Sequence, residues 1–382
     1  MSHTIPSKSA IFTKMLLAIP QSKSLSKLQI QWIVSQASLY TQQLKSELPD
    51  LFERRGLDDQ HHDGRYFDLI PILILTASSV SNIIITPEIM YEIMALTVYH
   101  FEVDDFIEHV LEVSNKQFVQ DVDTMLELLL DHQLSLEQIH CDTDSTYSSD
   151  DGSDSETLDP KTSDALSKLQ KFVEYHIHHP AVLSSPASLQ AQLRCDLASF
   201  IRAGIRQSEQ SKTFFTSGQL PTMSFYDWLY TTSIVNSGGF PWSSVTQALF
   251  SQQHPSTSAI DLVSSHLLSE VRTHIALKYR FTNDRTSLYR DRKENNLNCV
   301  DFPEFNFPQG DTHNDNKVAR VKADLLALEV CEERMCDGLF AELEATRMNR
   351  KEEERSEVKA VRFFKAVEVV HGAFYELKSH KQ

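Results

Sequence analysis

Two polar segments of the 382-residue chain carry oxygen side chains at helical spacing. The six candidate metal ligands are Asp104, Asp105 and Glu108 in the first segment and Asn283, Ser287 and Asp291 in the second. On an α-helix, side chains four residues apart stack on one face. Mg²⁺ prefers oxygen ligands and is usually bound by one or two carboxylates together with water and substrate phosphates. The spacing therefore predicts two helical metal stripes that face each other across an apolar cavity and hold a diphosphate group.

A solvated helix end is the alternative explanation for the first segment, because acidic clusters usually face solvent. Phe101, Phe106 and Ile107 lie among its acids, so part of the segment must be buried, and buried carboxylates need a partner such as a metal ion. The second segment places an amide, a hydroxyl and a carboxylate on successive turns, a mixture with little structural purpose. Arg290 lies on the same face and could meet a diphosphate oxygen, since a guanidinium suits phosphate.

Other charged residues are expected to face solvent. Arg292 and Lys293 follow the second stripe, and Glu294 would serve as the acidic ligand if the helix register differed. The acid- and histidine-rich run 58–63 could also bind a metal, but it lies in a polar turn without apolar neighbours. We therefore interpret that run as a solvated loop.

The composition indicates a helical protein of the cytoplasm. Only 10 Gly and 13 Pro occur, and 41% of the residues are hydrophobic, enough for a substantial core. A formal charge of −17 argues against nucleic acid as a partner, because phosphate binding needs a basic face. The five cysteines have no metal-ligand spacing, and the N-terminus lacks the apolar core of a signal peptide. The most apolar run, 69–85, is too short and too polar to predict a membrane span.

Hydrophobic periodicity predicts helices over most of the chain. The expected helices cover residues 28–44, two stretches between 66 and 100 that are divided near Thr86-Pro87, and 189–212, 224–235, 256–278, 317–347 and 352–377. Residues 142–160 differ abruptly, with seven acids, no Lys or Arg, and many Ser and Thr. We expect a disordered acidic loop within one domain there, with an interdomain linker as the alternative.

The second metal segment belongs to a longer run, 283–305, that resembles the second metal motif of class I terpene cyclases. More narrowly, it resembles the C-terminal class I domain of fungal bifunctional copalyl diphosphate/ent-kaurene-type diterpene synthases. Beyond the ligands, the residues that carry the resemblance are Asn296-Leu297-Asn298, Phe302-Pro303-Glu304-Phe305, Phe225-Tyr226-x-Trp228 and Thr231-Thr232-Ser233. The match is good over about 190–305, weak over 66–110 and absent from the N-terminus. Glu108 stands where many class I enzymes have Asp, and a Glu carboxylate is also an acceptable metal ligand.

The resemblance implies a single isoprenoid-synthase-type helical bundle over residues 1–382, with about ten to twelve helices around a deep apolar pocket. It implies Mg²⁺, three ions in number, as cofactor and an isoprenyl diphosphate as substrate. It also implies that a helix break at Gly238-Gly239 aims backbone carbonyls at an allylic cation, where the alternative is an ordinary turn. The aromatic residues that could line the cavity are Phe101, Phe225, Tyr226, Trp228 and Tyr230.

The predicted function is a class I diterpene cyclase that uses geranylgeranyl diphosphate, or a bicyclic diphosphate supplied by a separate class II cyclase. The Asp-x-Asp-Asp acid motif of class II cyclases is absent from the sequence, so no protonation-initiated cyclisation is expected. The alternatives are a sesquiterpene cyclase that uses farnesyl diphosphate, a chain-elongating prenyltransferase, and a non-catalytic helical descendant of the family. The two metal stripes argue against the last alternative, and the single aspartate-rich segment argues against the prenyltransferase.

Overall fold

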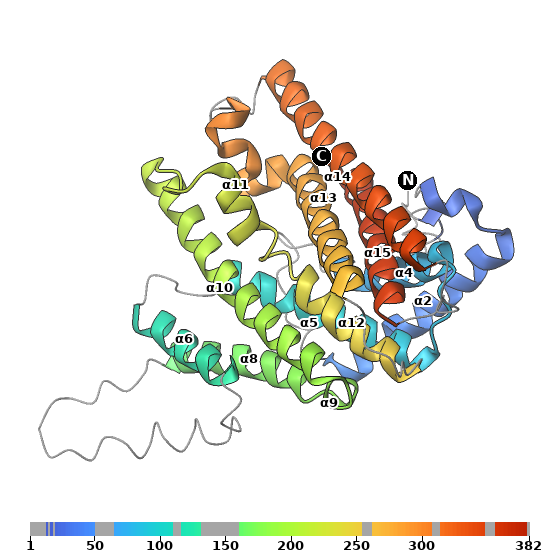
Figure 1. The fold of residues 1–382 in the computed structure, drawn as a ribbon. Coiled ribbons are helices and arrows are strands. Elements are labelled where there is room, and N and C mark those ends of the chain that lie inside the picture. The colour runs from blue at the N-terminus through green and yellow to red at the C-terminus, as the bar shows by residue number, and fades with distance from the viewer. Residues whose placement is uncertain are drawn as a thin grey trace, which may run out of the picture.

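The structure, a computed structural model, describes residues 20–49, 65–109, 116–130, 160–253, 262–307, 314–347 and 356–379, with three isolated residues before them. In these ranges the chain forms twelve α-helices and no strand, so the predicted all-α fold is confirmed (Figure 1). The run 58–63 and residues 142–159 of the acidic segment lie outside the described residues.

The first half of the chain contributes six helices to the bundle. They are α2 (Lys27–Glu47), α4 (Arg65–Ser81), α5 (Pro87–His109), α6 (Lys116–Leu130), α8 (Pro160–Ile177) and α9 (Pro180–Leu183), and a 3₁₀ turn, η1 (Pro20–Ser24), precedes them. α5 begins at Pro87, as expected, because proline has no N–H to lose in a first helical turn. The first metal segment therefore occupies the last turns of a largely buried helix.

The second half contributes the other six helices. They are α10 (Ala187–Ser217), α11 (Phe225–Trp228), α12 (Gly239–Gln253), α13 (Leu262–Glu294), α14 (Asp315–Arg347) and α15 (Ser356–Ser379). A π-helix, η2 (Leu229–Ser233), continues α11, and two 3₁₀ turns, η3 (Cys299–Asp301) and η4 (Pro303–Phe305), follow α13. α13 extends well beyond the expected 256–278, so the second metal segment lies on the same helix.

The helices enclose two apolar clusters. The larger cluster joins α2, α4, α5, α8, α10, α12 and α15. The smaller one packs Phe225 and Trp228 against Phe302, Phe305 and the middle of α13. α13 lies along both α14 and α15, which brings the second metal segment beside the C-terminal helices (Figure 1). Within the described part of the chain, none of the helices is both long enough and apolar enough to cross a membrane.

Candidate active site

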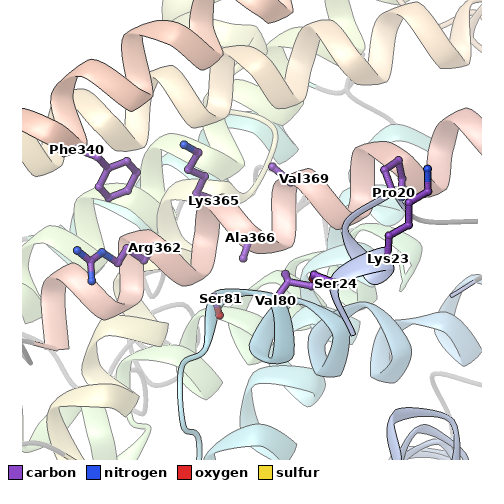
Figure 2. Close-up of a pocket in the computed structure, with 10 residues that line it drawn as sticks. All are labelled: Pro20, Lys23, Ser24, Val80, Ser81, Phe340, Arg362, Lys365, Ala366 and Val369. Carbon is purple, nitrogen blue, oxygen red and sulfur yellow. The ribbon is translucent and has the colours of Figure 1, made fainter. Parts of the chain in front are cut away.

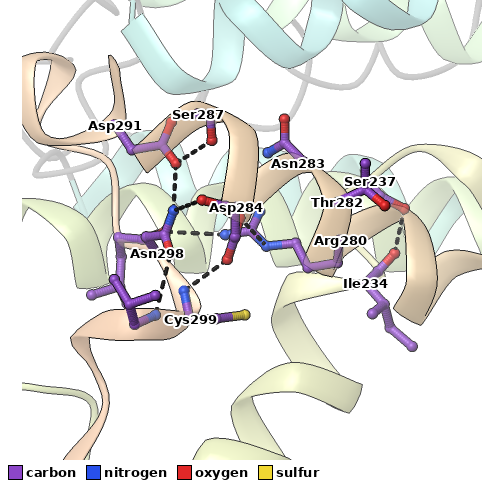
Figure 3. Close-up of polar contacts among 12 residues, drawn as sticks. Ile234, Ser237, Arg280, Thr282, Asn283, Asp284, Ser287, Asp291, Asn298 and Cys299 are labelled. Atoms are coloured by element: carbon purple, nitrogen blue, oxygen red, sulfur yellow. Dashed lines mark hydrogen bonds and ion pairs between the residues drawn. The ribbon is translucent and has the colours of Figure 1, made fainter. Parts of the chain in front are cut away.

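The second metal segment forms a continuous polar row on α13. Ser287 and Asp291 are almost fully buried, and Asn283 is half-buried one turn earlier. The Ser287 hydroxyl donates to Asp291 Oδ2 at 2.6 Å, so these two predicted ligands are in direct contact (Figure 3). The row therefore presents amide, hydroxyl and carboxylate oxygens from three successive turns of one helix.

Asn298 holds the carboxylate of this row in place. Its Nδ2 donates to Asp291 Oδ2 at 2.8 Å and to the backbone oxygen of Asp284 at 3.0 Å (Figure 3). Its side chain also accepts from the Val300 amide at 3.2 Å and so caps η3. The sequence resemblance includes Asn298 but gives it no role. Its contacts make it a positioning residue for a predicted ligand.

A buried ion pair supports the same helix from beneath. Asp284 is fully buried, 2.9 Å from Arg280 Nε, and accepts the Cys299 amide at 2.7 Å. Arg280 also donates to the Leu297 carbonyl at 3.1 Å and lies over the Trp228 ring. Burial raises the pKa of the Asp284 carboxyl, and Arg280 opposes that shift. These contacts tie the loop after α13 to the helix itself.

Arg292 is not solvated, contrary to the expectation from the sequence. Its guanidinium pairs with Asp301, which also accepts the Asn298 amide at 2.8 Å. Burial raises the pKa of Asp301 to about 6, although Arg292 opposes the shift. The chain turns back after α13 at Asn295, whose φ is +59°, and this reversal brings Asp301 to Arg292. A helical projection of residues 283–294 cannot show such a contact.

Arg290 lies on the open side of the row. Its side chain is 41% exposed, with its guanidinium 3.6 Å from Asp291 Oδ1 and 3.5 Å from Glu294 Oε2. These long, part-solvated ion pairs are weak. Arg290 is therefore held only weakly beside the predicted acidic ligand, and a diphosphate could compete for its N–H groups.

The first metal segment shares a face of α5 with residues that contact the helix break and α10. His100, Asp104 and Ile107 share one face of α5. A Cβ placed on Gly238 would lie 3.2 Å from His100 Nδ1, and one placed on Gly204 of α10 would lie 3.0 Å from Ile107. Asp104 is half-buried between these two contacts. The side chains of Asp105 and Glu108 lie outside the described set.

An imidazole connects the two metal segments. The His371 ring of α15 lies 5.9 Å from the Phe101 ring and is stacked on the Tyr279 ring at 5.2 Å. Phe101 is one turn before Asp104 on α5, and Tyr279 is one turn before Asn283 on α13. Both segments therefore start from rings that contact the same buried histidine, which the sequence did not single out.

The break itself is present between η2 and α12. Gly238 has a φ of +69°, a left-handed conformation that glycine adopts at little cost, and α12 begins at Gly239. Of the other predicted cavity residues, Phe225 and Trp228 are buried in the smaller apolar cluster. Tyr226, by contrast, is 63% exposed.

A histidine pair lies behind the break. His176 Nδ1 is 2.7 Å from the Phe172 carbonyl, and His176 Nε2 is 3.0 Å from His100 Nε2. Because the carbonyl can only accept, His176 carries its proton on Nδ1, and His100 donates from Nε2. Burial lowers the pKa of His176 to about 4 and lowers that of His100 well below its ordinary range. Both rings are therefore neutral near pH 7.

A separate open pocket lies away from these residues, between η1, the end of α4, α14 and α15 (Figure 2). Its volume is about 730 Å³. Its three charged lining residues, Lys23, Arg362 and Lys365, are all cationic, and it contains none of the predicted site residues.

The donor set on α13 fits Mg²⁺, since amide, hydroxyl and carboxylate oxygens are hard ligands and one carboxylate per ion is usual. Among the described side chains, no three His, Cys, Asp or Glu residues converge as a metal cluster. The row on α13 has only one such residue, Asp291, because its other two members are Asn and Ser.

No protein-family model matches the chain. Pimaradiene synthase pbcA of Emericella nidulans is 24% identical over 321 residues, which cover 77% of this chain and 32% of that protein. Ent-kaur-16-ene synthase of Fusarium fujikuroi is 23% identical over 328 residues, and phyllocladan-16-alpha-ol synthase of Phomopsis amygdali is 22% identical over 360 residues. The chain is a homologue of fungal diterpene synthases.

This homology confirms the resemblance predicted from residues 283–305. The alignments cover 81% and 85% of the chain for the latter two proteins, but only 32% and 34% of those proteins. The chain thus spans about a third of the length of the relatives that it matches.

Proposed function

We propose that this chain is a Mg²⁺-dependent class I terpene cyclase that ionises an isoprenyl diphosphate and cyclises the resulting cation. The observation that carries the proposal is the row Asn283, Ser287 and Asp291, oriented by Asn298. Its relatives are named as diterpene synthases, which favours a C20 substrate, either geranylgeranyl diphosphate or a bicyclic diphosphate from a separate class II cyclase. A cytoplasmic location remains part of the proposal.

In this proposal, the two polar segments bind the diphosphate end of the substrate. Asp104, Asp105 and Glu108 on α5 and the α13 row would hold three Mg²⁺ ions, and Arg290 at the rim would donate to a diphosphate oxygen. Bound Mg²⁺ neutralises the negative charge that develops on the leaving diphosphate. The residues must therefore keep their oxygens convergent while the C–O bond breaks.

The apolar end of the substrate would lie below the metal segments. Phe101, Tyr279 and His371 present ring faces at this level, where the π density of Phe and Tyr stabilises a cation. The break at Gly238-Gly239 would direct backbone carbonyls toward the same space. Phe225 and Trp228 would support this wall from the smaller apolar cluster, and Tyr226 would contribute only from the exposed side.

The test is incubation of the purified chain with C10, C15 and C20 isoprenyl diphosphates and with copalyl diphosphate, with and without Mg²⁺. We expect Mg²⁺-dependent cyclic hydrocarbons or alcohols from a C20 substrate, with release of diphosphate. Turnover of farnesyl diphosphate alone would assign a sesquiterpene cyclase instead. A lack of turnover with every substrate would contradict the proposal, as would a cyclic product that retains its diphosphate.

A further inference from the structure

The segment from Trp228 to Gly238 runs antiparallel to α10. Three contacts establish the register: Trp228 Nε1 donates to Gln210 Oε1 at 3.1 Å, Arg206 donates to the Thr231 carbonyl at 3.4 Å, and a Cβ placed on Gly204 would lie 2.7 Å from Asn236 Oδ1. Residue numbers rise along one element as they fall along the other. Gln207 of α10 therefore lies between the levels of Trp228 and Thr231, directly before Thr232 and Ser233 of the opposing segment.

Four buried polar side chains lie along this contact region, which we call the α10–break seam: Gln207, Thr232, Ser233 and Asn236. All four are buried, with exposed fractions of 4% or less. Gln207 Oε1, Thr232 Oγ1, Ser233 Oγ and Asn236 Oδ1 have no hydrogen-bond partner among the described residues. A buried polar atom without a partner is costly and rare in a native protein, so the cluster needs a ligand.

The two unpaired hydroxyls lie in the π-helix η2. Many buried or half-buried hydroxyls in regular helices of this chain donate to the carbonyl four residues earlier, as Thr286 does to Thr282 at 2.8 Å, although Thr246 of α12 does not. In η2 the Ile234 amide bonds the Leu229 carbonyl, five residues back, at 3.0 Å. The carbonyl four residues before Ser233 is thus already taken by a backbone amide, and π-turns of this kind are frequent at functional sites.

The chemistry of the seam selects a small neutral ligand. Its four unpaired atoms are two amide oxygens, which only accept, and two hydroxyls, which both donate and accept. None of the four groups is charged, so the seam does not compete with the acidic segments for a metal ion. Water satisfies two to four such groups at once.

We propose that the α10–break seam binds water and supplies the molecule that ends the reaction. This inference rests on the proposed function. Asn236 packs against Gly204, which also contacts Ile107 of the first metal segment, so the seam adjoins that segment. The water oxygen forms a C–O bond with the final carbocation, one O–H bond breaks, and the proton passes to the released diphosphate. The product is then a terpene alcohol.

The first experiment measures product identity in ¹⁸O-labelled water, with geranylgeranyl and copalyl diphosphates as substrates. Wild-type protein should give an alcohol that carries ¹⁸O. Asn236→Leu and Thr232→Val should lower the alcohol-to-alkene ratio about tenfold or more while total turnover changes by less. Thr41→Val removes an equally buried helical hydroxyl, which donates to the Ala37 carbonyl at 2.7 Å, and should leave the ratio unchanged. Active protein that makes only alkenes or unlabelled alcohol, or variants with the wild-type ratio, would overturn the inference.

The second experiment does not depend on activity, so it separates this inference from the proposed function. A hydroxyl bonded to water loses those bonds in Thr232→Val, which should lower the melting temperature by about 1 °C or more. Thr41→Val, which removes a hydroxyl bonded to a carbonyl, should lower it by a similar amount and serves as the reference for a hydroxyl with a partner. A Thr232→Val protein that is more stable than wild type would show a dry seam and overturn the inference, even if the chain cyclises its substrate. If Thr232→Val is destabilising but the chain turns over no isoprenyl diphosphate, water binding in the seam stands and only its proposed role in the reaction is contradicted.

Discussion

Replacement of Asn298 by Ala should weaken Mg²⁺ affinity and lower stability together. The buried Asn298 amide donates to the Asp291 carboxylate at 2.8 Å and to the Asp284 carbonyl at 3.0 Å, and its oxygen caps η3. The bond to a charged group contributes about 1.5–3 kcal/mol, the neutral bond about 1 kcal/mol and the cap about 1 kcal/mol. We therefore expect the free energy of unfolding to fall by about 4 kcal/mol, a large part of a typical total.

The catalytic consequence follows from the freed carboxylate. A group that orients a metal ligand typically changes metal affinity by about 10–100-fold, so the Mg²⁺ concentration for half-maximal turnover should rise by about that factor. Turnover is measured against Mg²⁺ concentration, and stability by urea unfolding without Mg²⁺. Asn298→Ser keeps an oxygen for the η3 cap but loses the amide donor, so it should show the Mg²⁺ effect with a smaller loss of stability.

The matched control is Asn314→Ala. Asn314 accepts the Lys317 amide at 3.2 Å at the exposed start of α14, so this change also removes an Asn cap, at a cost of about 1 kcal/mol. Its Mg²⁺ dependence should equal that of the wild type. A folded Asn298→Ser protein with a wild-type Mg²⁺ midpoint would refute the view that Asn298 orients a metal ligand.

Four further predictions follow from the structure and the sequence. Ser287→Ala should lower turnover by orders of magnitude and lower the free energy of unfolding by about 1.5–3 kcal/mol, because the buried hydroxyl donates to the Asp291 carboxylate, and wild-type turnover would remove Ser287 from the metal site. His176→Gln should flatten the acid side of the stability profile: burial lowers the pKa of His176 to about 4, so the unfolded chain binds more protons below about pH 6.5, and wild-type stability should fall as the pH drops from there toward 4. Gly238→Ala should cost more stability than Gly218→Ala, because both have positive φ but only Gly238 has a neighbour, His100 Nδ1, within 3.2 Å of the new Cβ; equal melting temperatures would contradict this. Deletion of residues 144–156 should leave turnover and melting temperature nearly unchanged, because loop length has a small entropic effect, and a collapse of stability would show that the acidic segment is structural.

The helices that could be predicted from the sequence have an amphipathic period or a clear terminal signal. α5 begins at the proline expected to start it, and α10 and α14 extend only a few residues beyond the predicted 189–212 and 317–347. α12 was not predicted. Residues 241–250 of that helix are buried on almost every side, so the segment lacks the polar face that produces a helical period. Gly239 and Pro241 at its start also suggested a loop.

The candidate site likewise has a part that the sequence predicts and a part that it does not. Spacing within one helix predicted the row on α13, because three of its side chains lie at four-residue steps. The contacts of Asn298, Arg292 and His371 could not be predicted, since each joins segments whose relation depends on a turn or on helix packing. The left-handed turn at Asn295 decides the first two contacts. A resemblance included Asn298 but gave it no role.

The structure also assigns different work to two aspartates seven residues apart on α13. Asp284 is fully buried. Its two oxygens bind Arg280 and the Cys299 amide, so its charge stabilises the loop against the helix. Asp291 shares one oxygen with a hydroxyl and an amide, and its other oxygen faces only the part-solvated Arg290 at 3.6 Å. A buried carboxylate that already has a cation and an amide gains little from a metal ion, whereas one held by neutral groups keeps most of its charge for a ligand. In the proposed site, Asp291 is therefore the carboxylate of the α13 row that would bind a metal ion, and the further negative charge for a diphosphate-bound Mg²⁺ cluster would come from the acids of α5. This division of charge is the physical reason why the proposed site uses two segments so distant in sequence.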